Sequence, residues 1–214
     1  SRHGLRLNTA VMSATQLNAA NALIAAALSS AGATQVSEIR VTDDVVATAM
    51  PTSGTGAEFY SIAFIGQPSL TQAWTLQLTG HQLTHNITYN AARVSATPMY
   101  LGAQPPNWTF GSGGSYLLNN ATTGTQHAPM ETQRQAVSAL ATAVQSSTVT
   151  AAAAKLSVNL SDLMFSPTAL GDVRFKVLNY PTGTLGRGVL YSNLTSSQQT
   201  AVKSMIEAWV KTQA

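Results

Sequence analysis

The first fifty residues carry apolar side chains at helical spacing. After Ser13, a plausible N-cap, apolar residues recur every three or four positions: Leu17, Ala20, Ile24 and Leu28. This pattern predicts a helix over residues 13–29 that ends at Gly32. A weaker pattern over residues 37–50 predicts a second helix, which ends before Pro51.

From Phe59 onwards the apolar period changes from helical to two, which is typical of strands. Strands are predicted around residues 60–64, 74–78, 83–89 and 94–100, with a turn at 90–92. Apolar residues lie on even positions before Gly80 and on odd positions after it. A change of parity at a glycine indicates a bulge or a tight turn there. These segments predict an antiparallel meander.

The remaining chain is mixed. Residues 102–114 are rich in Gly and Pro and predict a loop, and residues 131–149 predict a helix that 151–156 prolong or follow. A short strand is predicted at 173–177. Thr195 and Gln198 form a capping-box pattern before a final helix.

Together these elements predict an α+β domain, in which helices from both ends of the chain pack around a central antiparallel β-meander. We expect a single domain over residues 1–214. Its parts are a helical segment (1–50), a β-meander (58–101), a loop (102–128) and a helical or mixed segment (129–214).

The composition narrows the possible functions. Charged residues make up 9% of the chain, against about 25% in ordinary soluble proteins. The net charge is +3, and the basic residues are scattered, so no nucleic-acid partner is expected. The absence of cysteine excludes disulfides, a thiolate nucleophile and cysteine-ligated zinc. The longest apolar run, near residues 19–28, is too short to span a membrane.

Two features favour an exported protein, secreted or periplasmic. Ser, Thr, Asn and Gln supply the polar surface in place of ions. Asn-x-Ser/Thr, the acceptor pattern for N-glycosylation, occurs slightly more often than chance predicts, at Asn86, Asn107, Asn120, Asn159 and Asn193. The start at Ser1 carries no signal-peptide pattern, so either none existed or the sequence is a processed or trimmed form.

The densest group of polar side chains is the segment from Gly80 to Thr88. His81 and His85 lie on one face of the predicted strand, but about 13 Å apart at ~3.3 Å per residue, so they cannot chelate one ion. Each is either a hydrogen-bonded, half-buried residue or part of a site. The opposite face carries a row of polar side chains, which are Gln82, Thr84, Asn86 and Thr88. That row is either a solvated outer face or a ligand-binding face.

Two further groups are candidates for binding. His127 and Glu131 lie four residues apart at the start of a predicted helix, where the carboxylate either caps the helix or joins a site. Folding that brought His81, His127 and Glu131 together would form a divalent-metal site, although nothing in the spacing requires a cofactor. Tyr100 and Trp108 are candidates for stacking on a glycan, and Thr84 is a candidate for a polar contact with it.

Several motifs together resemble a family. They begin with Arg2-x-Gly4-Leu5 and a helix that ends in Leu28-Ser29-x-x-Gly32. The central motifs are Tyr60-x-x-x-Phe64-x-Gly66-x-Pro68, Trp74, Gly80-His81, Asn86, Pro98 and Gly102-Ala103-x-Pro105. The last is Gly188-Val189-Leu190-Tyr191-x-x-Leu194-Thr195-x-x-Gln198.

These motifs resemble the mostly bacterial domain-of-unknown-function family numbered 3500, over almost the whole chain. The resemblance implies a shared α+β fold and frequent export, and it brings no established reaction. Members typically show Gly-His-His-Leu-x-Leu-Asn, whereas this chain has Gln82 and His85 in place of the second His and the second Leu. Gln82 cannot supply the same base as a histidine.

Three functions remain open. The first is an enzyme, with hydrolysis as the default reaction, in which His81 is a base or metal ligand and Asn86 an orienting or oxyanion donor, joined by Gln82 and Arg2. The second is a non-catalytic exported module that binds a glycan, another surface polymer or a small molecule. The third is a structural subunit that self-associates in an extracellular assembly.

Overall fold

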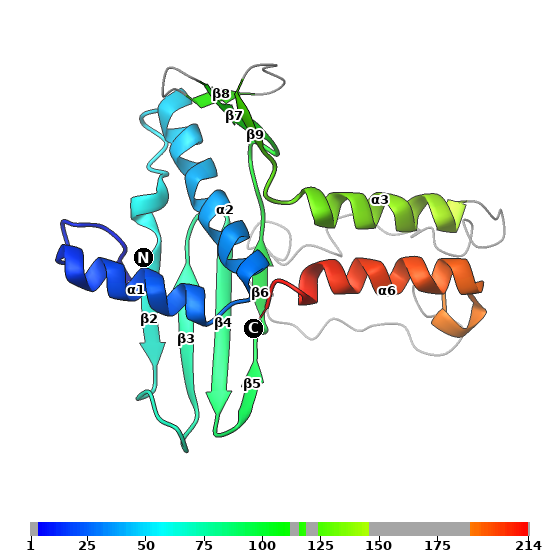
Figure 1. The fold of residues 1–214 in the computed structure, drawn as a ribbon, viewed down its shortest axis with the longest axis horizontal. Coiled ribbons are helices and arrows are strands. Elements are labelled where there is room, and N and C mark those ends of the chain that lie inside the picture. The colour runs from blue at the N-terminus through cyan, green and yellow to red at the C-terminus, as the bar shows by residue number, and fades with distance from the viewer. Residues whose placement is uncertain (1–3, 112–115, 119–123, 146–188, 214) are drawn as a thin grey trace, which may run out of the picture. The chain divides into compact units, whose positions relative to one another are not determined.

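A computed structural model of the chain describes residues 4–111, 116–118, 124–145 and 189–213 (Figure 1). The chain divides into two compact units, residues 1–134 with 207–214, and residues 135–206. Whether the units form the single predicted domain stays a prediction. The α+β class is confirmed, because helices accompany antiparallel sheets in the described residues.

The main sheet lies in the first unit, and all its pairings are antiparallel. Its strands are β1 (Leu5–Arg6), β2 (Ser61–Ile65), β3 (Trp74–Thr79), β4 (Leu83–Asn90), β5 (Arg93–Ser95) and β6 (Met99–Leu101). The order is β1-β2-β3-β4-β5, and β6 also pairs with β4. The predicted strand over residues 94–100 is therefore two short strands, separated at Pro98, which has no N–H for the ladder.

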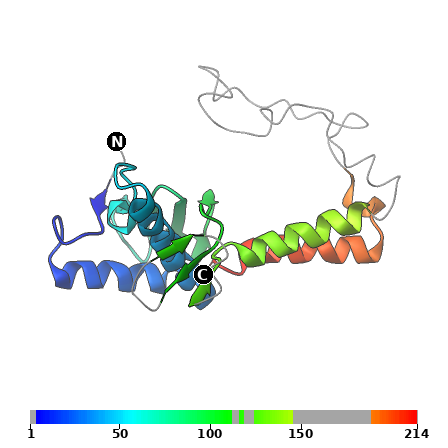
Figure 2. The same ribbon diagram turned by 90° about the horizontal axis from the view of Figure 1, so that it is seen from above.

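Helices α1 (Ala14–Ala26) and α2 (Ser30–Ala49) cross one face of this sheet (Figures 1 and 2). Ser13 caps α1 in a capping box with Gln16. Buried side chains from the two helices and from β2, β3 and β4 form one core, which includes Ile39, Tyr60 and Leu83. The short 3-10 helix η1 (Ala57–Phe59) leads into β2.

The prediction that the first helix stops at Gly32 and the second begins near Ser37 was wrong. The second helix begins at Ser30, because Ser29 caps it by accepting the Gly32 amide N–H. Gly32 lies in the first turn, where a Cβ atom would overlap the Thr212 carbonyl group. Glycine is needed there for the close approach of the C-terminal segment and not to end a helix.

A second sheet of three short antiparallel strands occupies part of the predicted loop 102–128. It contains β7 (Trp108–Phe110), β8 (Tyr116–Leu118) and β9 (Thr125–His127), in the order β8-β7-β9. Strands of three residues are too short to show alternation, so the sequence pattern did not predict them.

The remaining described elements include α3 (Glu131–Gln145), η5 (Tyr191–Asn193) and α6 (Ser196–Val210). Thr195 and Gln198 form the predicted capping box, since each accepts the other's backbone N–H. In the second unit α3 and α6 run side by side, and the Gln198 amide donates to the Ala143 carbonyl at 3.0 Å (Figures 1 and 2). The elements predicted at 151–156 and 173–177 lie outside the described residues.

Candidate functional site

The turn between β3 and β4 places the central candidate residues. β3 ends at Thr79 and β4 begins at Leu83, and the Gly80 N–H donates to the Leu83 carbonyl at 2.8 Å. The tight turn predicted at Gly80 is therefore confirmed. A Cβ atom on residue 80 would overlap the ring of Tyr60, which is fully buried, so this turn requires glycine.

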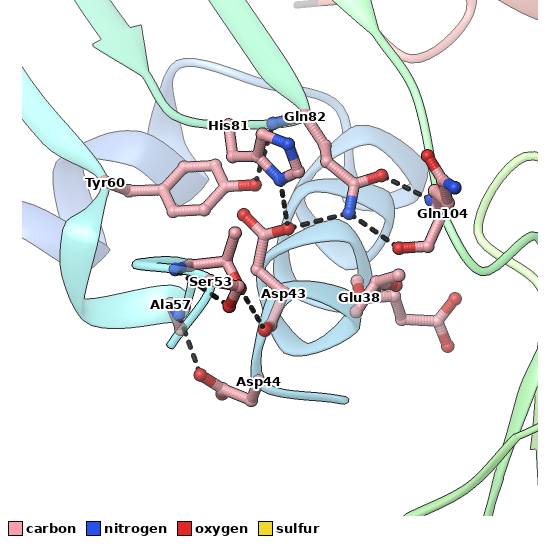
Figure 3. Close-up of polar contacts among 11 residues, drawn as sticks. Glu38, Asp43, Asp44, Ser53, Ala57, Tyr60, His81, Gln82 and Gln104 are labelled. Carbon is pink, nitrogen blue, oxygen red and sulfur yellow. Dashed lines mark hydrogen bonds and ion pairs between the residues drawn. The ribbon is translucent and has the colours of Figure 1, made fainter. Parts of the chain in front are cut away.

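Helix α2 presents Asp43 to this turn, and Asp43 is fully buried (Figure 3). Its Oδ1 atom lies 2.9 Å from His81 Nδ1 and accepts a hydrogen bond from Gln82 Nε2 at 2.7 Å. Burial of an ionised carboxylate is costly unless hydrogen bonds and opposite charge compensate for it. The two neighbouring side chains of one turn supply those partners.

This contact fixes the chemistry of the His81 ring. An ionised carboxylate only accepts hydrogen bonds, so Nδ1 of His81 carries the hydrogen and donates it to Asp43. In the neutral ring Nε2 then holds a lone pair and can accept a hydrogen bond or a proton. The His81 side chain is 48% exposed, so the ring can reach solvent or a bound molecule.

Gln82 joins the turn to a third segment of the chain. Its Nε2 atom donates to the Gln104 carbonyl at 2.9 Å, and its Oε1 accepts the Gln104 N–H. Gln82 is therefore buried against α2 and residue 104, and it does not belong to the polar row of β4 in which the sequence pattern placed it. The reason is that Gln82 lies in the turn, outside the alternation of the strand.

Tyr60 lies beneath this network, and its hydroxyl accepts the Gln82 N–H at 3.3 Å. Burial and the negative charge of Asp43, which the hydroxyl also contacts, raise the pKa of Tyr60 far above its ordinary value. Tyr60 therefore stays protonated and neutral. Oδ2 of Asp43 is buried without a hydrogen bond of normal geometry.

A cleft of about 540 Å³ opens beside His81. We call it the His81 cleft, and its lining residues are Val46, Ala49, Met50, Ser53, Thr55, His81, Gln104, Pro105 and Pro106. The Ser53 and Thr55 hydroxyls are 2.7 Å apart, and Thr55 Oγ1 also donates to the Asp43 carbonyl at 3.4 Å. A histidine held by a buried carboxylate at the wall of a cleft can act as a general base.

The comparisons with known proteins concern this whole chain. A family model described as "Protein of unknown function (DUF3500)" matches residues 1–214. The chain belongs to the DUF3500 family. No curated protein and no solved structure matches it in the same comparisons. The family resemblance of the sequence motifs is thereby confirmed.

The DUF3500 chain contains a second histidine–carboxylate pair on α2. Nδ1 of His127 lies 3.0 Å from Glu38 Oε1, and the His127 ring stacks on Trp108 with centroids 4.0 Å apart. Trp108 is buried, and its indole N–H donates to Thr42 Oγ1 at 3.0 Å. Of the two alternatives for Trp108, exposed or buried, the structure shows the buried one, with the ring packed in the second sheet.

The three predicted metal ligands of this DUF3500 chain have separate partners. His81 pairs with Asp43, His127 with Glu38, and Glu131 with Arg134 at 2.6 Å. Within the described residues, no group of three or more His, Cys, Asp or Glu side chains could hold a metal ion. The structure thus does not bring His81, His127 and Glu131 into one group.

The other predicted site residues lie apart from the His81 network. The Asn86 amide accepts a hydrogen bond from Gln77 Nε2 at 2.7 Å and donates one to the Pro98 carbonyl at 2.8 Å. Both contacts lie within the polar face of the sheet. Thr84 and Tyr100 are cross-strand partners, and Tyr100 is 60% exposed. Arg2 lies outside the described residues.

His85 differs from His81 in its exposure and in its hydrogen bonding. It is 2% exposed, and neither ring nitrogen has a hydrogen bond of normal geometry, although Gln213 lies near enough to affect it. Burial lowers the pKa of His85 below its ordinary value, which Gln213 opposes. The ring is therefore a neutral part of the core, more deeply buried than the half-buried residue that the sequence predicted.

Sequence reasoning missed Asp43, Tyr60 and Gln104 as members of this site. Asp43 follows Thr42 inside an apolar-periodic helix, and both are fully buried. Few acidic residues occur in the chain, so a carboxylate on the buried face of a helix was a usable signal. No pattern links positions 43, 81 and 104 along the chain, because only folding brings them together.

Proposed function

We propose that this protein is a hydrolase in which His81 acts as the general base. The supporting observation is the fully buried Asp43 carboxylate, which holds Nδ1 of His81 while the half-exposed ring lines a cleft. The Gln82 amide also donates to this carboxylate oxygen, so His81 shares the compensation of the buried charge with Gln82, and Nε2 of the half-exposed ring stays available for proton transfer.

The reaction that this arrangement suits is attack of water on a carbonyl group. Nε2 of His81 takes a proton from the water as its oxygen bonds to the carbonyl carbon. Asp43 stabilises the resulting imidazolium, as in other acid–histidine pairs. The same proton then passes to the leaving group as its bond to carbon breaks, so an ester yields an acid and an alcohol.

A substrate panel tests this proposal. Purified wild type and His81→Gln are compared on uncharged nitrophenyl esters, anilides and nitrophenyl glycosides. His81→Gln should lower turnover of the accepted class by roughly 10²–10⁴-fold, the usual contribution of a general base.

The matched control is His127→Gln, which removes the other histidine paired with a carboxylate of α2; His127 lies in β9 and does not line the His81 cleft. It should retain the activity of the wild type. Equal turnover by wild type and His81→Gln on every substrate class would reject the hydrolase proposal.

A second candidate function is binding of a glycan or polymer on the polar face of the main sheet. The observation that favours it is the exposed Tyr100 beside Thr84, next to the row of uncharged side chains on β3 and β4. Wild type, Tyr100→Ala and His81→Gln are each titrated with neutral oligosaccharides, and binding is followed by NMR. This experiment separates the two functions. Binding lost in Tyr100→Ala but kept in His81→Gln supports the binding module.

We also propose export, to the periplasm or the medium. Support comes from the small number of charges and from exposed acceptor asparagines such as Asn107 and Asn193. Fractionation of source cells with an antibody against the protein tests this, and recovery in the cytosolic fraction alone would reject it. No helix among the described residues has the length and apolar character that crossing a membrane requires.

A further inference from the structure

The residues that line the His81 cleft indicate the charge of the ligand that it can bind. The described residues that line it include no Asp, Glu, Lys or Arg, and His81 is the one titratable side chain among them. A charged ligand would leave water without an opposite charge to pair with, at a cost in free energy. The lining therefore favours an uncharged ligand.

The acidic groups around the cleft act against anions in particular. Asp43 lies directly behind His81, and Asp44, the next residue of α2, accepts the Ala57 N–H at 2.7 Å (Figure 3). Arg40, a partly buried cation of α2, donates to Asn21 Oδ1 and to the Ala57 carbonyl and lies over the Tyr60 ring, and the Asp44 charge acts on it as well. It does not line the cleft, and the described lining residues include no Lys or Arg that would pair with an anionic group.

The two walls of the cleft differ in polarity. The end of α2 supplies Val46, Ala49 and Met50, and Pro105 and Pro106 add to this apolar surface. The Ser53 and Thr55 hydroxyls form a polar wall; Thr55 donates to the Asp43 carbonyl and Ser53 to Thr55, so their remaining lone pairs accept from an N–H or O–H of a ligand. A ligand with an apolar acyl group and a neutral polar link matches both walls.

We infer that the His81 cleft binds uncharged acyl compounds, esters or amides of short apolar acids, and discriminates against acyl groups that carry a carboxylate. This inference deepens the proposed function and rests on it for the identity of the site. Discrimination arises from the lack of Lys and Arg among the described lining residues and from the Asp43 carboxylate behind His81.

Binding of two matched anilides tests the inference without requiring turnover. Butyranilide is neutral, whereas succinanilic acid has nearly the same shape and a terminal carboxylate. Each is titrated while the ring Cε1–H signal of His81, assigned by its loss in His81→Gln, is followed by NMR. We expect butyranilide to bind about 10-fold more tightly, a difference of about 1.4 kcal/mol.

Met50→Lys sharpens the test, because it places a cation on the apolar wall at a residue that is 57% exposed. It should narrow the preference for the neutral anilide by about 5- to 10-fold, a magnitude expected for one partly exposed charge pair. Leu70→Lys makes the same charge change at a residue that is 93% exposed and outside the cleft, so it should keep the wild-type preference.

The outcomes separate the two proposals. Equal or tighter binding of succinanilic acid, or no shift of the His81 signal with either anilide, overturns the inference. A retained preference for butyranilide without any His81-dependent turnover supports the inference about binding and rejects the hydrolase.

Discussion

His81 and His85 stand four residues apart in one β-hairpin, yet their surroundings differ completely. His81 lies in the turn, half exposed, with one ring nitrogen on a buried carboxylate. His85 lies in β4 on the core face, without a hydrogen bond of normal geometry to either nitrogen. The comparison teaches that a carboxylate partner and access to a cleft, rather than the residue type, make a histidine a candidate for catalysis.

The largest expected effect concerns the carboxylate that distinguishes the two histidines. Asp43→Asn should lower His81-dependent turnover by roughly 10²–10⁴-fold, because a neutral amide no longer stabilises the imidazolium or fixes the ring. The pH dependence of kcat should change as well, while KM changes little. Steady-state kinetics across pH measures this, and an unaltered pH profile would show that Asp43 has only a structural role.

The second test concerns the close packing of the turn. Gly80→Ala should destabilise the fold by about 3 kcal/mol, because the added methyl group meets the fully buried Tyr60 ring. Gly102→Ala is the matched control, since its methyl group meets only the hydroxyl end of the exposed Tyr100 side chain. Urea unfolding measures both variants. A similar loss of stability in Gly80→Ala and Gly102→Ala would contradict the requirement for glycine in this turn.

The third test removes the hydroxyl beneath the network. Tyr60→Phe should cost about 1–2 kcal/mol, because the buried Gln82 N–H loses its acceptor and Asp43 loses a neighbouring donor. The raised pKa of Tyr60 also predicts that its phenol remains un-ionised at pH values where exposed tyrosines titrate. Ultraviolet difference titration of wild type and Tyr60→Phe checks this. If wild type shows one more tyrosine titrating at the ordinary tyrosine pKa than Tyr60→Phe does, the raised pKa of Tyr60 is refuted.

The smallest expected effect concerns His85. Because its pKa is lowered by burial, the unfolded chain binds the proton more readily than the folded chain. Its contribution to stability is therefore complete above the ordinary histidine pKa of about 6.5, and it is lost as the pH falls below that value. His85→Leu should raise stability at pH 7 by about 1 kcal/mol and flatten the loss between pH 7 and 5.

Urea unfolding at the two pH values measures the effect of His85→Leu. Ile87→Leu, on the same face of β4, changes the packing without changing a titratable group and should keep the wild-type pH dependence. An identical loss of stability in wild type and His85→Leu would show that His85 does not sense acid.

Much of the fold could be predicted from local signals. The Ser13 and Thr195 caps, the alternation in β3 and β4 and the parity change at Gly80 all correspond to observed elements. The start of α2 was misplaced because Gly32 indicates a helix end in sequence and serves a tertiary contact in the structure. The strands of the second sheet were too short to leave a pattern.

The candidate site was predictable only in part. His81 and Gln82 were found because they stand beside a glycine in a dense polar segment. Asp43 was not found, because its role depends on a contact 38 residues along the chain. Thr84 and Asn86 were correctly placed on one face of the strand. Gln82 was not, because it lies in the turn before the strand begins.

The contact at Gly32 has a consequence for biosynthesis. Residues 207–214 belong to the same compact unit as residues 1–134, and Ser29 donates to the Lys211 carbonyl at 2.8 Å while Leu28 forms a β-bridge with Gln213. The segment between them, residues 135–206, is therefore an insertion in the first unit. A ribosome releases the closing residues only after the whole insertion has been made, so the first unit completes its core after translation of the second.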